Sequence, residues 1–151
     1  MLTGSCLCGT VAFKVESALT AIEVYHCSRC RKAYGSGLAA TVYVRLDGFR
    51  WVQGTEAVKV YDAPLRERPP QYRHAFCDRC GSPLPICREE FGFVEIPVGA
   101  LSGRVISTLE CEIFVEQRLQ WVSALGCVRQ FAKAAPHGEE VVRELFSSQT
   151  A

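Results

Sequence analysis

The chain has 151 residues, of which 48% are hydrophobic and 22% are charged, and its formal net charge at pH 7 is +1. This composition is typical of a folded globular protein and excludes an extensively disordered chain. The near-neutral charge gives no general basis for binding nucleic acid or a membrane surface. We therefore expect one domain over residues 1–151 that buries a substantial core.

The N-terminal residues have neither the basic nor the apolar region of a secretion signal. No apolar run approaches the ~20 residues that are needed to span a bilayer. The nine cysteines then indicate reduced thiols in a cytoplasmic protein, where close pairs more often bind metal than form disulfides. We expect a cytoplasmic, metal-dependent protein.

Short segments with alternating or β-branched residues predict strands along most of the chain. In chain order, the expected strands are residues 10–16, 22–26, 39–45, 49–52, 57–61, 72–76, 84–88, 92–98 and 110–116. Segments 49–52 and 57–61 are expected to pair as a hairpin around Gly54. A short helical turn should begin at Ser28, and an apolar stripe over residues 139–146 predicts a C-terminal helix. The predicted fold class is mostly β, built of several small antiparallel sheets.

Six of the nine cysteines form three close pairs, Cys6 with Cys8, Cys27 with Cys30, and Cys77 with Cys80. Two thiolates on one turn supply half of a tetrahedral zinc shell, so three pairs give one complete site and one incomplete site. One of the three pairs therefore lies outside the complete four-cysteine site.

The residues that follow each pair separate a structural site from a reactive one. Glycine follows Cys8 and Cys80, and its freedom at positive φ allows backbone N–H groups to turn toward the sulfurs. Arg31 and Lys32 follow Cys30 instead, and cations favour reactive thiolates. We therefore assign one structural zinc to four cysteines, Cys6, Cys8, Cys77 and Cys80, and predict Cys27 and Cys30 as the catalytic pair.

Three cysteine motifs together resemble the glutathione-dependent formaldehyde-activating enzymes, a family that also includes centromere protein V. The motifs are Gly-Ser-Cys-Leu-Cys-Gly-Thr-Val at 4–11, His-Cys-Ser-Arg-Cys-Arg-Lys at 26–32, and Phe-Cys-Asp-Arg-Cys-Gly-Ser-Pro-Leu at 76–84. Later landmarks, Val98-Gly99-Ala100-Leu101 and Ile113-Phe114-Val115 with Trp121, are also similar. The resemblance extends over roughly residues 3 to 131.

The resemblance implies a zinc-binding fold of the β-tent type and the structural zinc site assigned above. It also implies a second zinc, held by a Cys-x-Cys-x-x-Cys run, where glutathione meets formaldehyde to give S-hydroxymethylglutathione. The expected activity is that of a carbon–sulfur lyase on a glutathione–aldehyde adduct. Arg31 and Lys32 are candidates for binding the carboxylates of glutathione, with small-molecule thiols and aldehydes as partners.

The chain departs from the family pattern at Tyr25, where relatives have a cysteine. A catalytic zinc usually has three protein ligands and one open position. A third ligand beside Cys27 and Cys30 could come from His26 or, through folding, from Cys87, Cys111 or Cys127. Glu112 also lies where many relatives have a histidine.

Three functional hypotheses follow. The first is the lyase, with Cys27 and Cys30 at its centre. The second is a non-catalytic zinc module that uses the same fold for interactions. The third is a thiol redox protein in which Cys27 and Cys30 cycle through a disulfide. His74 and His137 are expected to be structural, and the three remaining cysteines are expected to be small buried hydrophobes.

Overall fold

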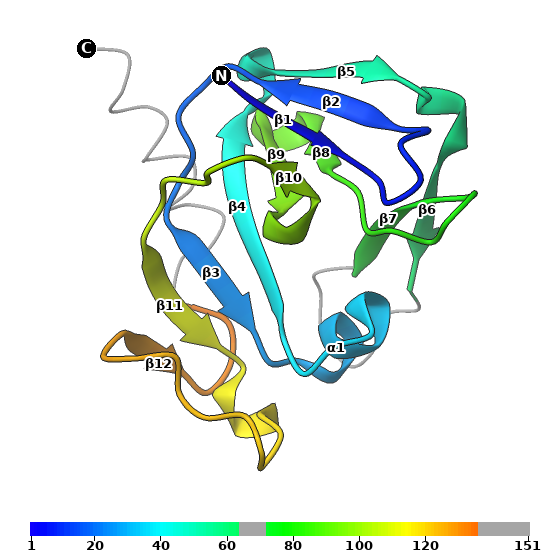
Figure 1. Cartoon of the computed structure of the whole chain (residues 1–151). Helices are drawn as coiled ribbons and strands as arrows, with labels where there is room; N and C mark the ends of the chain where they lie inside the picture. The colour runs from blue at the N-terminus through cyan, green and yellow to red at the C-terminus, as the bar shows by residue number, and fades with distance from the viewer. Residues whose placement is uncertain (64–71, 136–151) are drawn as a thin grey trace.

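Short strands and one helix make up most of the regular structure in the computed structural model (Figure 1), which describes residues 1–63 and 72–135. The strands form three sheets of four, six and two strands within the described residues. Five single-turn 3-10 helices join them, at Leu46–Gly48, Thr55–Ala57, Glu89–Phe91, Val98–Ala100 and Val115–Gln117. The predicted mostly β class is confirmed.

The four-stranded sheet is antiparallel and contains the first strands of the chain. Its order is β10-β1-β2-β5, with bounds Leu101–Ser102, Leu2–Ser5, Ala12–Val15 and Phe49–Gln53. Buried Phe13 and Val15 alternate with half-buried residues along β2, so that one face of this sheet is buried. Gly4 lies opposite Phe13 in the register, and a Cβ there would be 2.1 Å from the Phe13 ring. Glycine at this position therefore lets the Phe13 ring cross the neighbouring strand.

The six-stranded sheet has the order β12-β11-β3-β4-β9-β8. Its strands are Arg129–Phe131, Leu109–Ile113, Ile22–Tyr25, Ala39–Arg45, Phe93–Pro97 and Ile86–Arg88. Strand β4 is central and pairs antiparallel with β3 and β9. Strand β11 pairs in parallel with both β3 and β12, a pairing that period-2 patterns alone do not predict. Parallel neighbours need a long connection. Most of the other strands accordingly lie between β3 and β11 in the sequence.

The main core lies between these two sheets. Its buried members come from β2, β4 and β9, with Ala100 beside them: Phe13, Val15, Val42, Val44, Val94, Ile96 and Ala100. β-Branched residues on β4 and β9 therefore face the aromatic residues of the four-stranded sheet. The opposite face of the six-stranded sheet carries polar side chains, among which Glu23, Tyr25 and Tyr43 contact one another.

The third sheet is the pair β6 and β7, at Val58–Asp62 and Arg73–Cys77. The predicted hairpin between 49–52 and 57–61 is wrong, because β5 pairs with β2 while β6 pairs with β7. Gly54 has a φ of 73° and begins the 3-10 turn Thr55–Ala57, which directs the chain out of one sheet and into another. Glycine is needed here, because a Cβ would lie 2.1 Å from the Thr10 carbonyl oxygen.

Helix α1, Ser28–Tyr34, follows β3 directly and confirms the helical turn predicted after Cys27. Gly35, with a φ of 61°, ends it in the left-handed conformation. Figure 1 shows α1 at the same end of the molecule as β7 and the end of β3. The C-terminal helix predicted at 139–146 lies outside the described residues.

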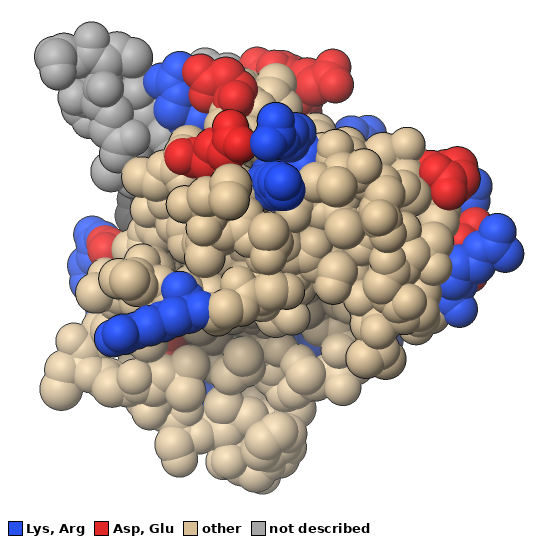
Figure 2. Space-filling view, turned by 45° about the horizontal axis from the view of Figure 1, so that its top comes forward, with Lys and Arg blue, Asp and Glu red and all other residues tan. Residues whose placement is uncertain are grey.

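Charged side chains of both signs lie close together on the face drawn in Figure 2, where much of the surface is uncharged. Surface ion pairs of the described residues include Arg50 with Glu16 and Arg45 with Asp47. Among the described residues, no helix has the length and apolar character needed to cross a membrane.

Candidate functional site

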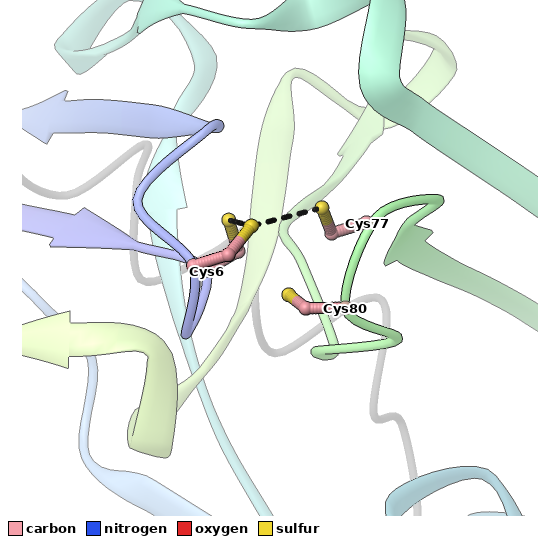
Figure 3. Close-up of side chains that lie close together, drawn as sticks. Cys6, Cys77 and Cys80 are labelled. Atoms are coloured by element: carbon pink, nitrogen blue, oxygen red, sulfur yellow. Dashed lines mark hydrogen bonds between the residues drawn. The ribbon is translucent and has the colours of Figure 1, made fainter.

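Four cysteine sulfurs from two distant turns meet at the end of the four-stranded sheet. Cys6 and Cys8 lie between β1 and β2, while Cys77 ends β7 and Cys80 lies in the turn after it. All four sulfurs are within 4.8 Å of one another, with Cys6 and Cys8 3.4 Å apart and Cys8 and Cys77 4.0 Å apart. Figure 3 shows Cys77 and Cys80 directed toward Cys6 across this gap. The group could hold a metal ion.

Tight turns create this convergence. Gly9 and Gly81 have φ values of 76° and 74°, as expected for the glycines after each pair. Their N–H groups close the two turns by donating to the carbonyl oxygens of Cys6 and Cys77, respectively. The N–H of Val11 donates to the Cys6 sulfur over 3.3 Å, which helps to orient this sulfur. Each turn is therefore shaped to present two sulfurs inward.

The sulfurs differ in their electrostatic surroundings. Hydrogen bonding from Ser82, whose hydroxyl is 3.3 Å from the sulfur, lowers the pKa of Cys80 to about 5. Hydrogen bonding from Thr10 lowers the pKa of Cys8, whereas burial raises that of Cys77 to about 11. Hydrogen bonding therefore favours the thiolate forms of Cys80 and Cys8. Four sulfur donors fit a tetrahedral ion such as zinc.

Cys27 and Cys30 are joined by a disulfide, whereas we expected two thiols. Their Cα atoms are 5.4 Å apart, and only 7% and 6% of the two residues, respectively, are exposed. Cys27 is the N-cap of α1, and the N–H of Cys30 donates to its sulfur over 3.3 Å. The other seven cysteines are unbonded to sulfur, as expected.

Aromatic residues surround the disulfide. Tyr25, Tyr34, Tyr72 and Phe114 pack against Cys27, Cys30 and Ala39. Phe114 has a φ of 55°, the only positive value of a non-glycine residue in the described chain. A bulky residue in this conformation is strained, and such strain often accompanies functional sites.

The cations predicted to bind glutathione lie on α1, in the turn after Cys30. The Nε of Arg31 donates to the carbonyl oxygen of His26 over 3.1 Å, so part of the guanidinium already holds the end of β3. Lys32 is exposed. Arg29, which the sequence did not single out, lies 5.3 Å from the centre of the Tyr72 ring.

The Tyr25 hydroxyl binds polar side chains of β3 and β4. That hydroxyl lies 3.0 Å from a Glu23 carboxylate oxygen and also contacts the hydroxyl of Tyr43, which is 3.1 Å from the same oxygen. Burial, followed by the charges of neighbouring groups, raises the pKa of Tyr25 far above its usual range. Tyr25 is therefore a neutral phenol, and its hydroxyl is bound to Glu23 and Tyr43.

None of the alternative third ligands joins Cys27 and Cys30 in the described part of the chain. The ring of His26 binds Glu112, Cys111 lies 4.0 Å from a Glu23 oxygen, and Cys87 packs at the core between the large sheets. Cys127 is exposed. The four-cysteine group is the sole cluster of three or more metal-ligating side chains among residues 1–63 and 72–135.

His26 and Glu112 form a buried pair that sequence analysis did not identify. The His26 Nε2 lies 2.7 Å from Glu112 Oε2, and both side chains are 0% exposed. Arg118 also binds Oε2, at 3.0 Å, while the Leu125 N–H donates to Oε1 over 3.0 Å. These hydrogen bonds outweigh burial and lower the pKa of Glu112. The sequence signal was limited to a histidine beside Cys27, since its acidic partner lies 86 residues later.

The remaining histidines were expected to be structural. His74, on β7, stacks on Phe76 and contacts the ring of Tyr34, and burial lowers its pKa. His137 lies outside the described residues.

Comparison with known proteins relates this architecture to one family. A crystal structure of a Rhodobacter sphaeroides protein, a structural-genomics target, is similar with a TM-score of 0.53 and 28% identity, over 69% of this chain and 91% of that one. A Halomonas elongata protein, provisionally named a glutathione-dependent formaldehyde-activating enzyme, is 38% identical over 89 residues, covering 56% of this chain and 54% of that protein. The chain thus spans about half the length of this curated relative. The family model for glutathione-dependent formaldehyde-activating enzymes matches residues 1–117. The chain belongs to the family of the glutathione-dependent formaldehyde-activating enzymes.

Proposed function

We propose that the protein is a cytoplasmic carbon–sulfur lyase that acts on an adduct of glutathione and a small aldehyde, with the reduced Cys27 and Cys30 at its centre. Zinc is the metal proposed for the four-cysteine group, where it joins the β1–β2 turn to the turn after β7. Family membership supports the substrate class. The observation that carries the site is the buried cysteine pair inside an aromatic enclosure, next to the cations of α1.

In the breakdown direction, the adduct loses its hydroxyl proton and its C–O bond becomes a carbonyl. The C–S bond breaks with its electron pair going to sulfur, which then takes up a proton. Lys32 and the guanidinium of Arg31 would bind the carboxylates of glutathione and direct its sulfur toward the cysteine pair. The surrounding tyrosines and Phe114 would exclude water from the reacting carbon.

Cys27 and Cys30 by themselves supply fewer ligands than a second, catalytic zinc usually has. Zinc bound to sulfur would activate the thiol of glutathione as a thiolate. A catalytic zinc site usually has three protein ligands. Among the described residues, no third ligand lies beside Cys27 and Cys30, and the Tyr25 hydroxyl is bound to Glu23. Binding of a second metal by Cys27 and Cys30 therefore stays a prediction, and no step above depends on it.

Exchange NMR with glutathione and formaldehyde tests the lyase. Protein that has been reduced and loaded with zinc should accelerate interconversion of the free and adduct forms over buffer alone. Lys32→Ala should weaken apparent glutathione binding and leave the rate at saturation nearly unchanged, because the exposed side chain of Lys32 would contact only the carboxylates. The proposal fails if zinc-loaded, reduced wild type leaves the exchange rate at its buffer value.

A non-catalytic zinc module of the same fold is the second candidate. The observation that favours it is that no third donor lies beside Cys27 and Cys30 within residues 1–63 and 72–135. This candidate predicts one zinc per chain in wild type and in Cys27→Ser, with equal stability, and no acceleration in the NMR assay. Two tightly bound metals in wild type would exclude it.

A further inference from the structure

We propose that Cys27 and Cys30 form a dithiol–disulfide pair that exchanges electrons with glutathione. The inference rests on the part of the proposed function that brings glutathione to this site, and it adds a redox reaction to the lyase. Nothing in the family assignment requires it. The observation that motivates it is the disulfide between Cys27 and Cys30.

The backbone of α1 positions the pair to open and close without rearrangement. The Cα separation of 5.4 Å lies within the range over which a disulfide forms. Cys27 precedes the first residue of α1 and Cys30 is the third helical residue, so the helix itself sets this spacing. Gln117 accepts a hydrogen bond from the Ser28 N–H over 2.9 Å, which fixes the turn between the two cysteines. The same backbone can therefore carry two thiols or one disulfide.

A bound metal ion would compete with the disulfide for the two sulfurs. A metal held by three donors would keep both sulfurs as separate thiolates. In the described chain, no third donor joins them, and Tyr25 is held by Glu23 and Tyr43. Two adjacent thiols that bind no metal can be oxidised to a disulfide.

The surroundings favour glutathione over a bulky protein partner. Both cysteines are more than nine-tenths buried, so that a protein surface would have little direct access. A tripeptide is much smaller than a protein surface, and the exposed Lys32 on α1 could bind one of its carboxylates.

The reaction balances with glutathione as the named reductant. A glutathione thiolate attacks one sulfur, the Cys27–Cys30 bond breaks, and a mixed disulfide forms while the other cysteine leaves as a thiolate and takes up a proton. A second glutathione thiolate attacks the glutathione sulfur of the mixed disulfide. Oxidised glutathione leaves, and the remaining cysteine thiolate is protonated. Overall, two glutathione thiols supply two electrons and two protons to the pair.

The test uses the full, metal-loaded chain equilibrated in buffers of reduced and oxidised glutathione, then quenched with an alkylating reagent. Trypsin cleaves after Arg29, so an intact disulfide links two peptides that separate on reduction. Mass spectrometry should show complete conversion from linked to doubly alkylated peptides as the proportion of reduced glutathione rises. Cys27→Ser and Cys30→Ser should each abolish the linked species and instead trap a mixed disulfide with glutathione on the remaining cysteine.

Cys127→Ser provides a matched control, because it removes an exposed thiol outside the site and should leave the conversion unchanged. The inference is overturned if the peptides stay linked at every ratio, if they never link in oxidised glutathione, or if reduced wild type holds a second tightly bound metal. The lyase is tested separately by exchange NMR on protein reduced with a dithiol. Loss of NMR acceleration with an intact redox transition would refute the lyase alone, and the reverse result would refute the redox pair alone.

Discussion

Replacing Glu112 by alanine should destabilise the protein strongly, because one buried carboxylate accepts hydrogen bonds from several elements. It binds His26 at 2.7 Å, Arg118 and the Leu125 N–H at 3.0 Å each, and Gln130 at 3.4 Å. Breaking a buried ion pair by removing one partner typically costs about 3–5 kcal/mol. Arg118 is 19% exposed and can turn toward water, but His26 cannot. The expected loss is therefore about 3 kcal/mol, near the lower end of that range.

Urea unfolding of the metal-loaded protein, followed by tryptophan fluorescence and circular dichroism, would measure this loss. A total stability of about 5–15 kcal/mol is usual for a domain, so the midpoint should fall sharply at an unchanged slope. Glu112→Gln keeps an oxygen for the Leu125 N–H and should lose only about 1–2 kcal/mol.

Glu16→Ala is the matched control, because it removes an exposed carboxylate paired with Arg50 and should cost about 0–1 kcal/mol. If Glu112→Ala lowers stability no more than Glu16→Ala does, the reasoning about the buried pair is refuted.

Three further predictions concern the metal group, the sheets and acid stability. Ser82→Ala removes the hydroxyl beside the Cys80 sulfur and should weaken zinc binding about 10- to 100-fold in competition with a chelator; unchanged affinity would contradict the assigned hydrogen bond. Gly4→Ala places a Cβ 2.1 Å from the Phe13 ring and should cost about 1–3 kcal/mol in urea unfolding, whereas wild-type stability would show that the strands can separate. The pKa of Glu112 is lower in the folded state than in the unfolded state, so its contribution is complete above the unfolded value of ~4.3 and is lost as the pH falls through the folded value. The stability difference between wild type and Glu112→Gln should therefore shrink from pH ~6 to pH ~3, and a difference that grows toward acid would reverse the assigned sign.

Local patterns were sufficient to predict most strands and the four-cysteine group. Strand β4 occupies the predicted residues 39–45, because its β-branched residues fit a buried central strand. The glycines after Cys8 and Cys80 have the positive φ expected of them. Both features depend on a few neighbouring residues, so the sequence contains the information directly.

Long-range pairing was less predictable. The hairpin expected around Gly54 does not form, because this glycine lies against the Thr10 carbonyl and the chain leaves the sheet there. The parallel pairing of β11 with β3 was also missed. Turn residues report on local backbone conformation, whereas the choice of a partner strand depends on packing between distant segments.

The same limit applies to the candidate site. The basic neighbours of Cys27 and Cys30 distinguish this pair from the four-cysteine group. The sequence could not show that the pair is bonded or that Tyr25 is held by Glu23 and Tyr43. These contacts depend on side-chain directions across β3 and β4. The roles of Arg31 and Lys32 as glutathione ligands stay predictions.

The parallel pairing of β11 with β12 has a practical consequence for where this domain ends. The family match stops at residue 117, yet β12 at Arg129–Phe131 completes the six-stranded sheet and Gln130 contacts the Glu112 carboxylate. A fragment cut at residue 117 would leave a sheet edge unpaired and remove three of the four partners of Glu112. The folding unit therefore extends at least to Phe131, and a boundary drawn from family similarity alone would divide it.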